Sequence, residues 1–389
     1  MNMIPYGRQD ISEADINAVV DVLRSDFLTQ GPKVPAFEQA VASYAGASYG
    51  VAVNSATSAL HIACRALGVG PGDAVWTSPN TFVASANCAL YSGAEVDFVD
   101  IDPRTYNMSV DRLAEKLEQA KATNSVPKVV IPVHFAGQPC DMAAIHALSQ
   151  QYGFQIIEDA SHAIGGRYKG EPIGSCRYSA ITVFSFHPVK IITTGEGGMA
   201  LTSDPVLAER MVQFRSHGIT SKPELMHARP VDEIWNYQQI DLGNNYRMTD
   251  MQAALGLSQM VMLDEFVSVR HAIAARYDEQ LKALPVTTPW RSPDGYSGMH
   301  LYVIRLKLEK IHRTQRDVYE SLKEQGIGVN LHYIPVYRQP YYESKGFKAG
   351  YCPEAEQYYR EAISIPMYPG LTADLQDKVV DAIDKALKP

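Results

Sequence analysis

The chain has 389 residues, which is long enough for a large core and two domains. Its 46% hydrophobic and 20% charged residues are typical of a globular protein, and its net charge of −8 argues against general nucleic-acid binding. The five cysteines form no CxxC pair, no signal-peptide core opens the chain and no apolar run could span a bilayer, so we expect a soluble, cytoplasmic protein without disulfides, structural metal or membrane partner.

The first part of the chain alternates short apolar runs with helical patterns. Ser12 is expected to cap a first helix, and a second helix follows the loop at residues 28–33. Strands are then expected over residues 50–53, 74–77, 95–99, 128–133, 155–158, 180–184 and 199–203. Helices are expected over residues 58–67, 84–91, 109–120 and 142–152. This alternation predicts βαβ units in a mostly parallel sheet, with ligands beyond the carboxyl ends of the strands.

The pattern changes at residues 251–269, where a long helix is expected to link two domains. Beyond it, residues 301–306 alternate like a half-exposed strand, residues 328–333 suggest another strand, and helices are expected around 318–322 and 375–387. We therefore expect a large domain over residues 1–255 and a smaller α+β domain over residues 256–389, against which the N-terminal segment packs.

Lys190 follows an apolar run that we interpret as a buried strand. Pro188 and the glycines from Gly195 onward exclude a regular helix across this stretch. A lysine in a tight turn past a buried strand loses water, which lowers its pKa and allows its amine to form a Schiff base with a carbonyl. The alternative is an ordinary surface lysine on a loop.

Two further segments follow predicted strands. Residues 54–58 open a helix, whose free N–H groups and positive dipole end make an anion cradle; the alternative is an ordinary N-cap by Ser55 or Thr57. Asp159 is costly to bury without a partner, and a protonated ring nitrogen would be a suitable one; the alternative is a structural Asp that caps the next helix.

Two ring side chains complete the set of candidates. His162 either donates to a ligand oxygen or is a packed histidine, and Phe82 either stacks on a flat ring or lies in the core. Together the segments supply an amine, an acid, a phosphate cradle and a stacking ring. Pyridoxal 5′-phosphate presents the complement, because it carries an aldehyde, a pyridine nitrogen, a phosphate and a flat ring.

At this point the chain resembles the sugar aminotransferases of the DegT/StrS type, which share the aspartate aminotransferase-like fold type I. The resemblance covers nearly the whole chain, and its motifs lie at residues 54–60, 158–163, 185–190 and 243–248. It implies a large domain with a mostly parallel seven-stranded sheet, a smaller α+β C-terminal domain and pyridoxal 5′-phosphate as cofactor.

Roles carried over by motif are implied by this resemblance. Lys190 would bind the cofactor aldehyde covalently, Asp159 would pair with the pyridinium nitrogen, and His162, where many relatives have Gln, would contact the phenolic oxygen. Phe82 would stack on the ring. The phosphate would be bound by Ala56, Thr57 and Ser185, together with Asn245 of the partner subunit, which implies a homodimer with shared active sites; the alternative for Asn245 is a turn residue.

Within the family, the chain is most similar to the transaminases of the pseudaminic acid pathway. This similarity implies transfer of an amino group from L-glutamate to C4 of a UDP-4-keto-6-deoxy-N-acetylhexosamine, which gives UDP-4-amino-4,6-dideoxy-N-acetyl-β-L-altrosamine. Lys33 stands near the place where this subgroup often has a basic residue directly after Gly31. The candidate sugar-nucleotide contacts are Tyr6, Gln30, Lys33, His187, His332 and Tyr333; His332 and Tyr333 equally suit packed strand residues.

The mechanistic hypothesis is ping-pong transamination, in which Lys190 moves a proton as general base and then as acid. Other readings are an aminotransferase for another UDP- or dTDP-keto sugar, and a cofactor-binding regulator without turnover. A nucleotide-binding enzyme on a doubly wound sheet is a further alternative, which is weakened because no G-x-G-x-x-G follows the first strand.

Overall fold

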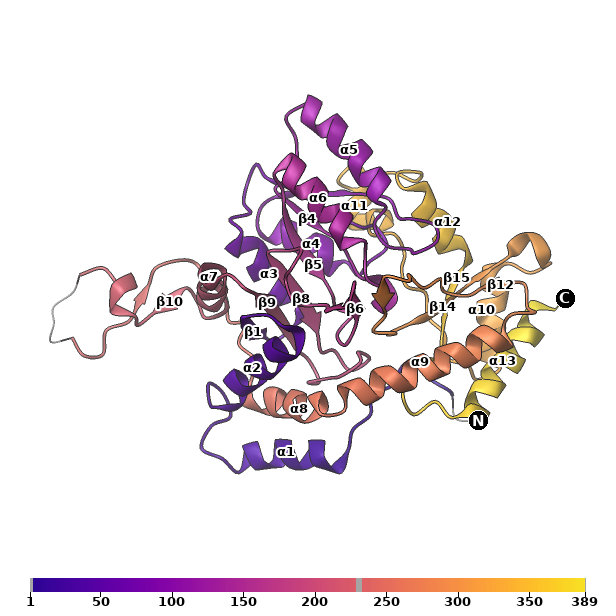
Figure 1. The fold of residues 1–389 in the computed structure, drawn as a ribbon, viewed down its shortest axis with the longest axis horizontal. Helices are drawn as coiled ribbons and strands as arrows, with labels where there is room; N and C mark the ends of the chain where they lie inside the picture. The colour runs from indigo at the N-terminus through magenta and orange to yellow at the C-terminus, as the bar shows by residue number, and fades with distance from the viewer. Residues whose placement is uncertain (1–2, 229–232, 389) are drawn as a thin grey trace.

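The computed structural model describes residues 3–228 and 233–388. Its largest unit is a seven-stranded sheet in the order β1-β9-β8-β5-β4-β2-β3, with helices packed around it (Figure 1). Its strands are β1 Tyr49–Val53, β2 Ala74–Thr77, β3 Glu95–Phe98, β4 Val129–Ile131, β5 Gln155–Asp159, β8 Ile181–Ser185 and β9 Gly198–Thr202. Only β9 runs antiparallel to its neighbours, so the mostly parallel sheet predicted from the sequence is confirmed.

The helices around this sheet begin where the sequence supplies caps. The Ser12 hydroxyl accepts the amide of Asp15, whose carboxylate in turn accepts the Ser12 amide, so the predicted first helix is confirmed with a capping box. These helices are α1 Glu13–Leu23, α2 Lys33–Ala45, α3 Ala56–Ala66, α4 Ala84–Tyr91, α5 Val110–Ala122, α6 Met142–Tyr152 and α7 Pro205–Arg215. The last of them, α7, has no counterpart in the sequence prediction.

The apolar face predicted for α1 is only partly covered. Val22 is buried, whereas Ile16 and Leu23 are exposed on the surface of the chain. Where α1 contacts α8, polar groups join the two helices: Gln259 donates from its amide to the buried Asp15 carboxylate at 2.7 Å. The helix is therefore placed by this polar contact as well as by apolar packing.

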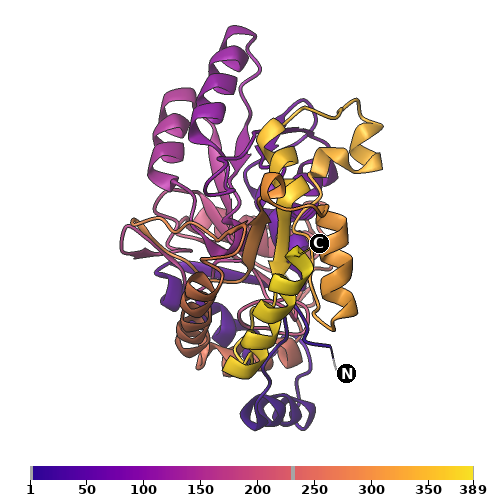
Figure 2. The same ribbon diagram turned by 90° about the vertical axis from the view of Figure 1, so that its right-hand side faces the viewer.

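The predicted long helix at residues 251–269 is two helices, α8 Asp250–Met260 and α9 Leu263–Gln280. The break follows from their different neighbours, because α8 packs on α1 and α2 whereas α9 extends to α13 (Figures 1 and 2). The other C-terminal helices are α10 Gln315–Glu324, α11 Pro340–Glu343, α12 Pro353–Glu361 and α13 Ala373–Leu387.

A second hydrophobic core lies beside a three-stranded antiparallel sheet of β12 Val286–Thr287, β14 Tyr302–Leu306 and β15 Ala362–Ile365. Helices α9, α10 and α13 contribute to this core, and so does Ile4, whose backbone pairs with Ile327. The core of the large sheet also contains residues from the C-terminal third, such as Val303 and Tyr337. The division into domains at residue 255, which falls inside α8, stays a prediction.

Two strand predictions in the C-terminal part are wrong. Residues 328–333 form no strand; Asn330 makes one isolated bridge to Ser364, and the chain then turns toward the large sheet, where the Tyr333 amide donates to the Asn80 side chain at 3.2 Å. The strand at 302–306 is not half-exposed, because β14 is the central strand of its sheet and lies between two cores.

Short elements complete the described chain. They are the strands β6 Arg167–Tyr168, β7 Glu171–Pro172, β10 Ile219–Thr220, β11 Gln238–Gln239 and β13 Gly295–Tyr296, and the 3₁₀ helices η1 Phe135–Gly137, η2 Pro223–Leu225, η3 Leu308–Lys310 and η4 Val336–Arg338. In the ranges that the structure describes, no helix combines the length and apolarity needed to cross a membrane. All five cysteines are free.

Candidate active site

A cavity of about 970 Å³ opens at the carboxyl ends of the parallel strands. Asn54 follows β1, Asp159 ends β5 and Ser185 ends β8, so three strands deliver polar groups to one place. This is where a doubly wound sheet binds its ligands. The predicted site residues that line this cavity are Tyr6, Ala56, Thr57, Phe82, Asp159, His162, Ser185, His187, Lys190, His332 and Tyr333.

Lys190 lies in the turn that follows β8. Its amide donates to the carbonyl oxygen of His187 at 2.9 Å, and the Thr194 amide donates back to Phe186, so the turn closes on the end of the strand. Burial lowers the pKa of Lys190 to about 8, while the negative charge of Asp159 opposes the shift. The predicted desolvation is confirmed, and it makes the amine a nucleophile and proton acceptor near neutral pH.

Asp159 is the last residue of β5 and is only 4% exposed. Its Oδ2 accepts the Ser85 hydroxyl at 2.6 Å, and its Oδ1 accepts the hydroxyl and the amide of Ser161 at 2.6 and 3.1 Å. A buried carboxylate that accepts several hydrogen bonds is held in one orientation, and the hydrogen bonds favour its charged form. The arrangement presents a fixed negative charge to the cavity.

The hydrogen bonds of His162 define which ring nitrogen carries its proton. Its Nδ1 accepts the backbone amide of Ala136 at 3.2 Å, and burial together with the charge of Lys190 holds its pKa well below the usual range. The ring is therefore neutral, with its proton on Nε2, which lies 3.2 Å from the Tyr333 hydroxyl. His162 can thus offer a hydrogen bond from Nε2 on the cavity side.

The first turn of α3 provides the anion cradle. The Ser55 hydroxyl caps the helix by accepting the Ser58 amide, while the amides of Ala56 and Thr57 precede the first intrahelical acceptor. Gly198 lies against this turn so closely that a Cβ on it would come within 2.5 Å of the Ser55 backbone. Ser55 is therefore an N-cap, as the alternative proposed, and the remaining amides still border the cavity.

Aromatic side chains surround the opening. Phe82 is 60% exposed, so it is not a core residue, and its ring centroid lies 6.5 Å from that of Tyr333. Nδ1 of His332 is hydrogen-bonded to the Ser364 hydroxyl at 2.8 Å, and its ring lies 5.5 Å from that of Tyr6. His332 and Tyr333 lie outside any regular strand, and both border the cavity.

Three predicted residues do not reach the cavity of their own chain: Gln30, Lys33 and Asn245. Gln30 has φ of 55° and precedes Gly31, whose amide donates to the Asp250 carboxylate at 2.6 Å. Lys33 begins α2. Asn245 is exposed and its backbone pairs with Ser216, which agrees with the expectation that it does not serve the site of its own subunit.

Sequence reasoning missed several residues that border the cavity: Ser85, Ser161, Glu196, Gln252, His300 and Asn330. Ser161 lies inside a stretch that was singled out, and its position two residues after Asp159 suits an Asx turn. His300 stands in no motif, yet its ring centroid lies 4.5 Å from that of His162. In the described ranges, Lys190 is the single lysine or arginine that lines the cavity.

Comparison with known proteins gives a consistent picture. Residues 9–384 match the DegT/DnrJ/EryC1/StrS aminotransferase family. The chain is 39% identical over 390 residues to the spore coat polysaccharide biosynthesis protein SpsC of Bacillus subtilis, covering 100% of this chain and 98% of that protein. It is 36% identical to the UDP-4-amino-4,6-dideoxy-N-acetyl-β-L-altrosamine transaminase of Campylobacter jejuni, covering 94% and 93% of the two chains.

Solved structures agree with this match. Helicobacter pylori PseC, described as an aminotransferase involved in the biosynthesis of pseudoaminic acid, superimposes with a TM-score of 0.90 at 30% identity over 99% of both chains. Spr1654 of Streptococcus pneumoniae in its PLP form superimposes with a TM-score of 0.87 at 29% identity, covering 99% of this chain and 100% of the other.

Proposed function

The chain belongs to the DegT/DnrJ/EryC1/StrS aminotransferase family and is a sugar aminotransferase, and on this premise we propose that it makes a UDP-4-amino sugar. The amino group comes from L-glutamate and is transferred to C4 of a UDP-4-keto-6-deoxy-N-acetylhexosamine. The product is UDP-4-amino-4,6-dideoxy-N-acetyl-β-L-altrosamine. The observation that carries the proposal is that an amine of lowered pKa, Lys190, and a buried carboxylate, Asp159, border one cavity.

The residues of this cavity fit pyridoxal 5′-phosphate. The free amides of Ala56 and Thr57, beside the Ser185 hydroxyl, suit a phosphate, since anions bind well at helix N-termini. Asp159, fixed by two serines, suits a protonated ring nitrogen. The exposed ring of Phe82 is available to stack on a flat heterocycle.

When bound, pyridoxal 5′-phosphate supplies an aldehyde that takes up amines and a ring that accepts the electron pair released at carbon. The Lys190 amine attaches to the cofactor and, when free, accepts a proton from the donor carbon and returns it during amination, because its pKa of about 8 lies close to neutral pH. The Asp159 carboxylate keeps a positive charge on the ring nitrogen that faces it.

The histidines of the cavity act as neutral hydrogen-bonding groups. Burial and the nearby Lys190 lower the pKa of His332 to about 3, and His162 and His300 are shifted in the same direction. His162 donates from Nε2 toward the phenolic oxygen of the cofactor. Neutral rings next to Lys190 favour the uncharged amine, since added positive charge would lower its proton affinity further.

Sugar-nucleotide contacts are proposed for the ring side chains near the opening. Tyr6, His187, His332 and Tyr333 border the cavity and offer hydroxyl and imidazole groups that hydrogen-bond sugar hydroxyls. Gln30 and Lys33 lie outside this lining, so their contact with a sugar nucleotide stays a prediction.

We further propose a homodimer in which Asn245 of the partner subunit binds the cofactor phosphate. Two observations support it: Asn245 does not border its own cavity, and the segment before it extends away from the body of the chain (Figure 1). Trp235, Tyr237 and Leu242 on that segment are largely exposed, which suits an interface. The expected cytoplasmic location stays a prediction.

A second candidate is amino transfer to a different UDP- or dTDP-keto sugar. It is favoured by the 39% identity to a protein named for spore coat polysaccharide biosynthesis, which exceeds the identity to the altrosamine transaminase. Both candidates share the cofactor chemistry and differ only in the acceptor.

The test uses the purified protein supplied with pyridoxal 5′-phosphate. We expect a visible absorption band that L-glutamate bleaches, and turnover with UDP-4-keto-6-deoxy-N-acetylhexosamine in a panel of UDP- and dTDP-4-keto sugars. Lys190→Ala should abolish both, whereas Lys345→Ala, which changes an exposed lysine outside the cavity, should retain both.

Different failures have different meanings. Turnover with another sugar alone would replace the proposed acceptor by the second candidate. A band without turnover on any sugar would favour a cofactor-binding regulator, and full turnover of Lys190→Ala would remove the role of this lysine.

A further inference from the structure

The turn η1 Phe135–Gly137 lies between the sheet and the cavity. It follows β4, and the His134 amide donates to the Asp159 carbonyl oxygen at 3.0 Å, so the turn starts beside the end of β5. Ala136 within it adopts φ of 57°, a left-handed conformation that is uncommon for residues other than glycine. Such a conformation persists where the surroundings hold it from several sides.

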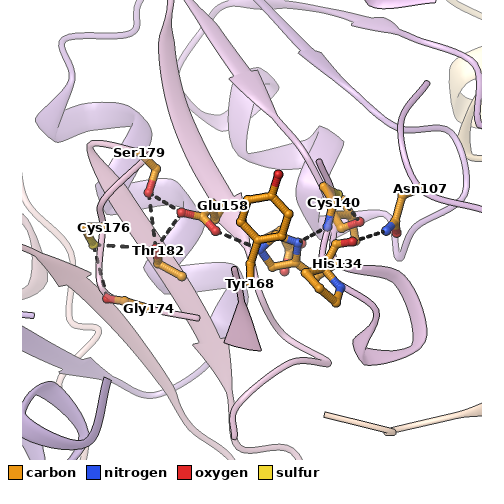
Figure 3. Close-up of polar contacts among 12 residues, drawn as sticks. Asn107, His134, Cys140, Glu158, Tyr168, Gly174, Cys176, Ser179 and Thr182 are labelled. Carbon is orange, nitrogen blue, oxygen red and sulfur yellow. Dashed lines mark hydrogen bonds and ion pairs between the residues drawn. The ribbon is translucent and has the colours of Figure 1, made fainter. Parts of the chain in front are cut away.

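Glu158 and His134 hold the first side of this turn. Figure 3 shows the Glu158 carboxylate between the hydroxyls of Ser179 and Thr182 on one side and the His134 ring on the other. The distance from His134 Nε2 to Glu158 Oε2 is 2.8 Å, and His134 Nδ1 accepts the Cys140 amide at 3.0 Å. The His134 ring therefore joins the end of β5 to the chain segment that leaves the turn.

Asn107 holds the second side. Its Oδ1 accepts the Phe135 amide at 2.9 Å, and its Nδ2 donates to the carbonyl oxygens of Gln138 and Pro139 at 3.0 and 3.1 Å (Figure 3). Asn107 is 2% exposed, so these bonds do not compete with bulk water. One side chain thus joins both ends of the turn.

The turn in turn holds two cavity histidines. The Ala136 amide donates to His162 Nδ1 at 3.2 Å, and the Ala136 carbonyl oxygen accepts the His300 amide at 3.0 Å. Gly137 lies so close to His162 that a Cβ on it would come within 2.8 Å of the His162 carbonyl oxygen. A shift of this turn would therefore change the hydrogen bond that determines where His162 carries its proton.

We propose that Asn107, His134 and Glu158 are positioning residues that hold the Ala136 amide against His162 and thereby keep the His162 proton on Nε2. None of the three lines the cavity. They act through the turn η1, and their effect reaches the cavity only as the tautomer of one ring. Without the Ala136 amide at Nδ1, the two neutral tautomers of His162 would compete, and Nε2 would lose its proton in part of the molecules.

The value of this arrangement for catalysis rests on the proposed function. If His162 donates to the phenolic oxygen of the cofactor, only the Nε2-protonated ring is competent. The tautomer itself is a property of the chain and can be measured before any cofactor is added.

The experiment measures the His162 tautomer by ¹⁵N NMR of the cofactor-free full-length protein labelled at histidine. Its signals are assigned by their loss in His162→Gln. We expect the wild-type ring to be neutral at pH 7 with the proton on Nε2. Asn107→Asp keeps the acceptor for Phe135 but loses both donated bonds, and Glu158→Gln removes the charge opposite His134. Both variants should mix the tautomers and make the Ala136 amide exchange about tenfold faster.

Cys176→Ala is the matched control. Cys176 lies at the far end of the same network, where its thiol contacts the Gly174 and Leu201 carbonyl oxygens rather than the turn (Figure 3). It should leave the His162 signals unchanged. A wild-type ring with its proton on Nδ1 would overturn the proposal even if a variant failed to fold.

A network that only stabilised the fold would lower the melting temperature of Asn107→Asp and Glu158→Gln and leave the tautomer unaltered, and that result would also overturn the proposal. Because the NMR signal needs no cofactor, this failure is distinct from failure of the proposed function, which would appear as a missing absorption band in a protein with the expected tautomer.

Discussion

The hydroxyl of Ser85, in the first turn of α4, donates a hydrogen bond of 2.6 Å to Oδ2 of Asp159, at the end of β5. Thr81 lies 2.8 Å from the same hydroxyl, and Ser161 binds the other carboxylate oxygen. The carboxylate that the sequence brought forward for its charge is therefore oriented by a residue 74 positions away in the chain. This contact joins α4 to β5 at the floor of the cavity.

Replacing Ser85 should show how much this contact contributes. Ser85→Ala leaves one oxygen of a buried carboxylate without its donor, so we expect the free energy of unfolding to fall by about 1–3 kcal/mol in the cofactor-free protein. Urea denaturation measures it. In Ser92→Ala, the control, the lost hydroxyl donates only to a carbonyl of the same helix, and the loss should be smaller. An equal loss in both variants would mean that the Asp159 contact adds nothing.

Lys190 should titrate near pH 8. Burial lowers its pKa and the Asp159 charge partly restores it, so Asp159→Asn should lower the pKa further. Only the neutral amine reacts with acylating reagents; labelling of Lys190 in the cofactor-free protein should therefore rise with pH through a midpoint near 8 in the wild type. The midpoint should lie at lower pH in Asp159→Asn.

The measurement is the labelled fraction of the Lys190 peptide by mass spectrometry across a pH series. Exposed Lys345 in the same digest serves as an internal control and should label only at higher pH. A Lys190 midpoint equal to that of Lys345 would contradict the desolvated turn, and a shift to higher pH in Asp159→Asn would contradict the charge interaction.

Phe82 should contribute to cofactor binding by stacking. Phe82→Ala is expected to raise the dissociation constant of pyridoxal 5′-phosphate by about two- to tenfold, which corresponds to a stacking contribution of about 0.5–1.5 kcal/mol. Both measurements are made in a Lys190→Ala background, so that binding is reversible, and are read by equilibrium dialysis. Tyr341→Ala removes an exposed aromatic outside the cavity and should change nothing. Unchanged binding in Phe82→Ala would exclude stacking.

The cysteines should be free but slow to react. Burial raises the pKa of Cys176 to about 12, and the contact with Cys64 followed by burial raises that of Cys88. With a thiol reagent at pH 8, five thiols per chain should react in denaturant, and in the native protein the reaction should be about a hundredfold slower. One rapidly labelled thiol in the native protein would contradict this packing.

The order of local elements was predictable because it depends on residues close in sequence. The strand at 74–77 and the helices at 84–91 and 142–152 have the predicted bounds, since apolar periodicity and flanking turn residues act over a few positions. Prediction failed at residues 328–333, where apolar composition suggested a strand. The bonds that hold this segment come from Asn80 and Ser364, which no local pattern reveals.

The sequence by itself determined the alternating architecture, the lysine turn after a buried strand, and the acid that ends its neighbour, because each depends on a short run of side chains and on strand order. Only the tertiary structure decided that Ser85 orients Asp159, that Ala136 defines the His162 proton, and that Phe82 lies at an open surface rather than in the core. The physical reason is that hydrogen-bond direction, burial and charge interaction fall off within a few ångströms in space, whereas these partners lie tens of residues apart along the chain.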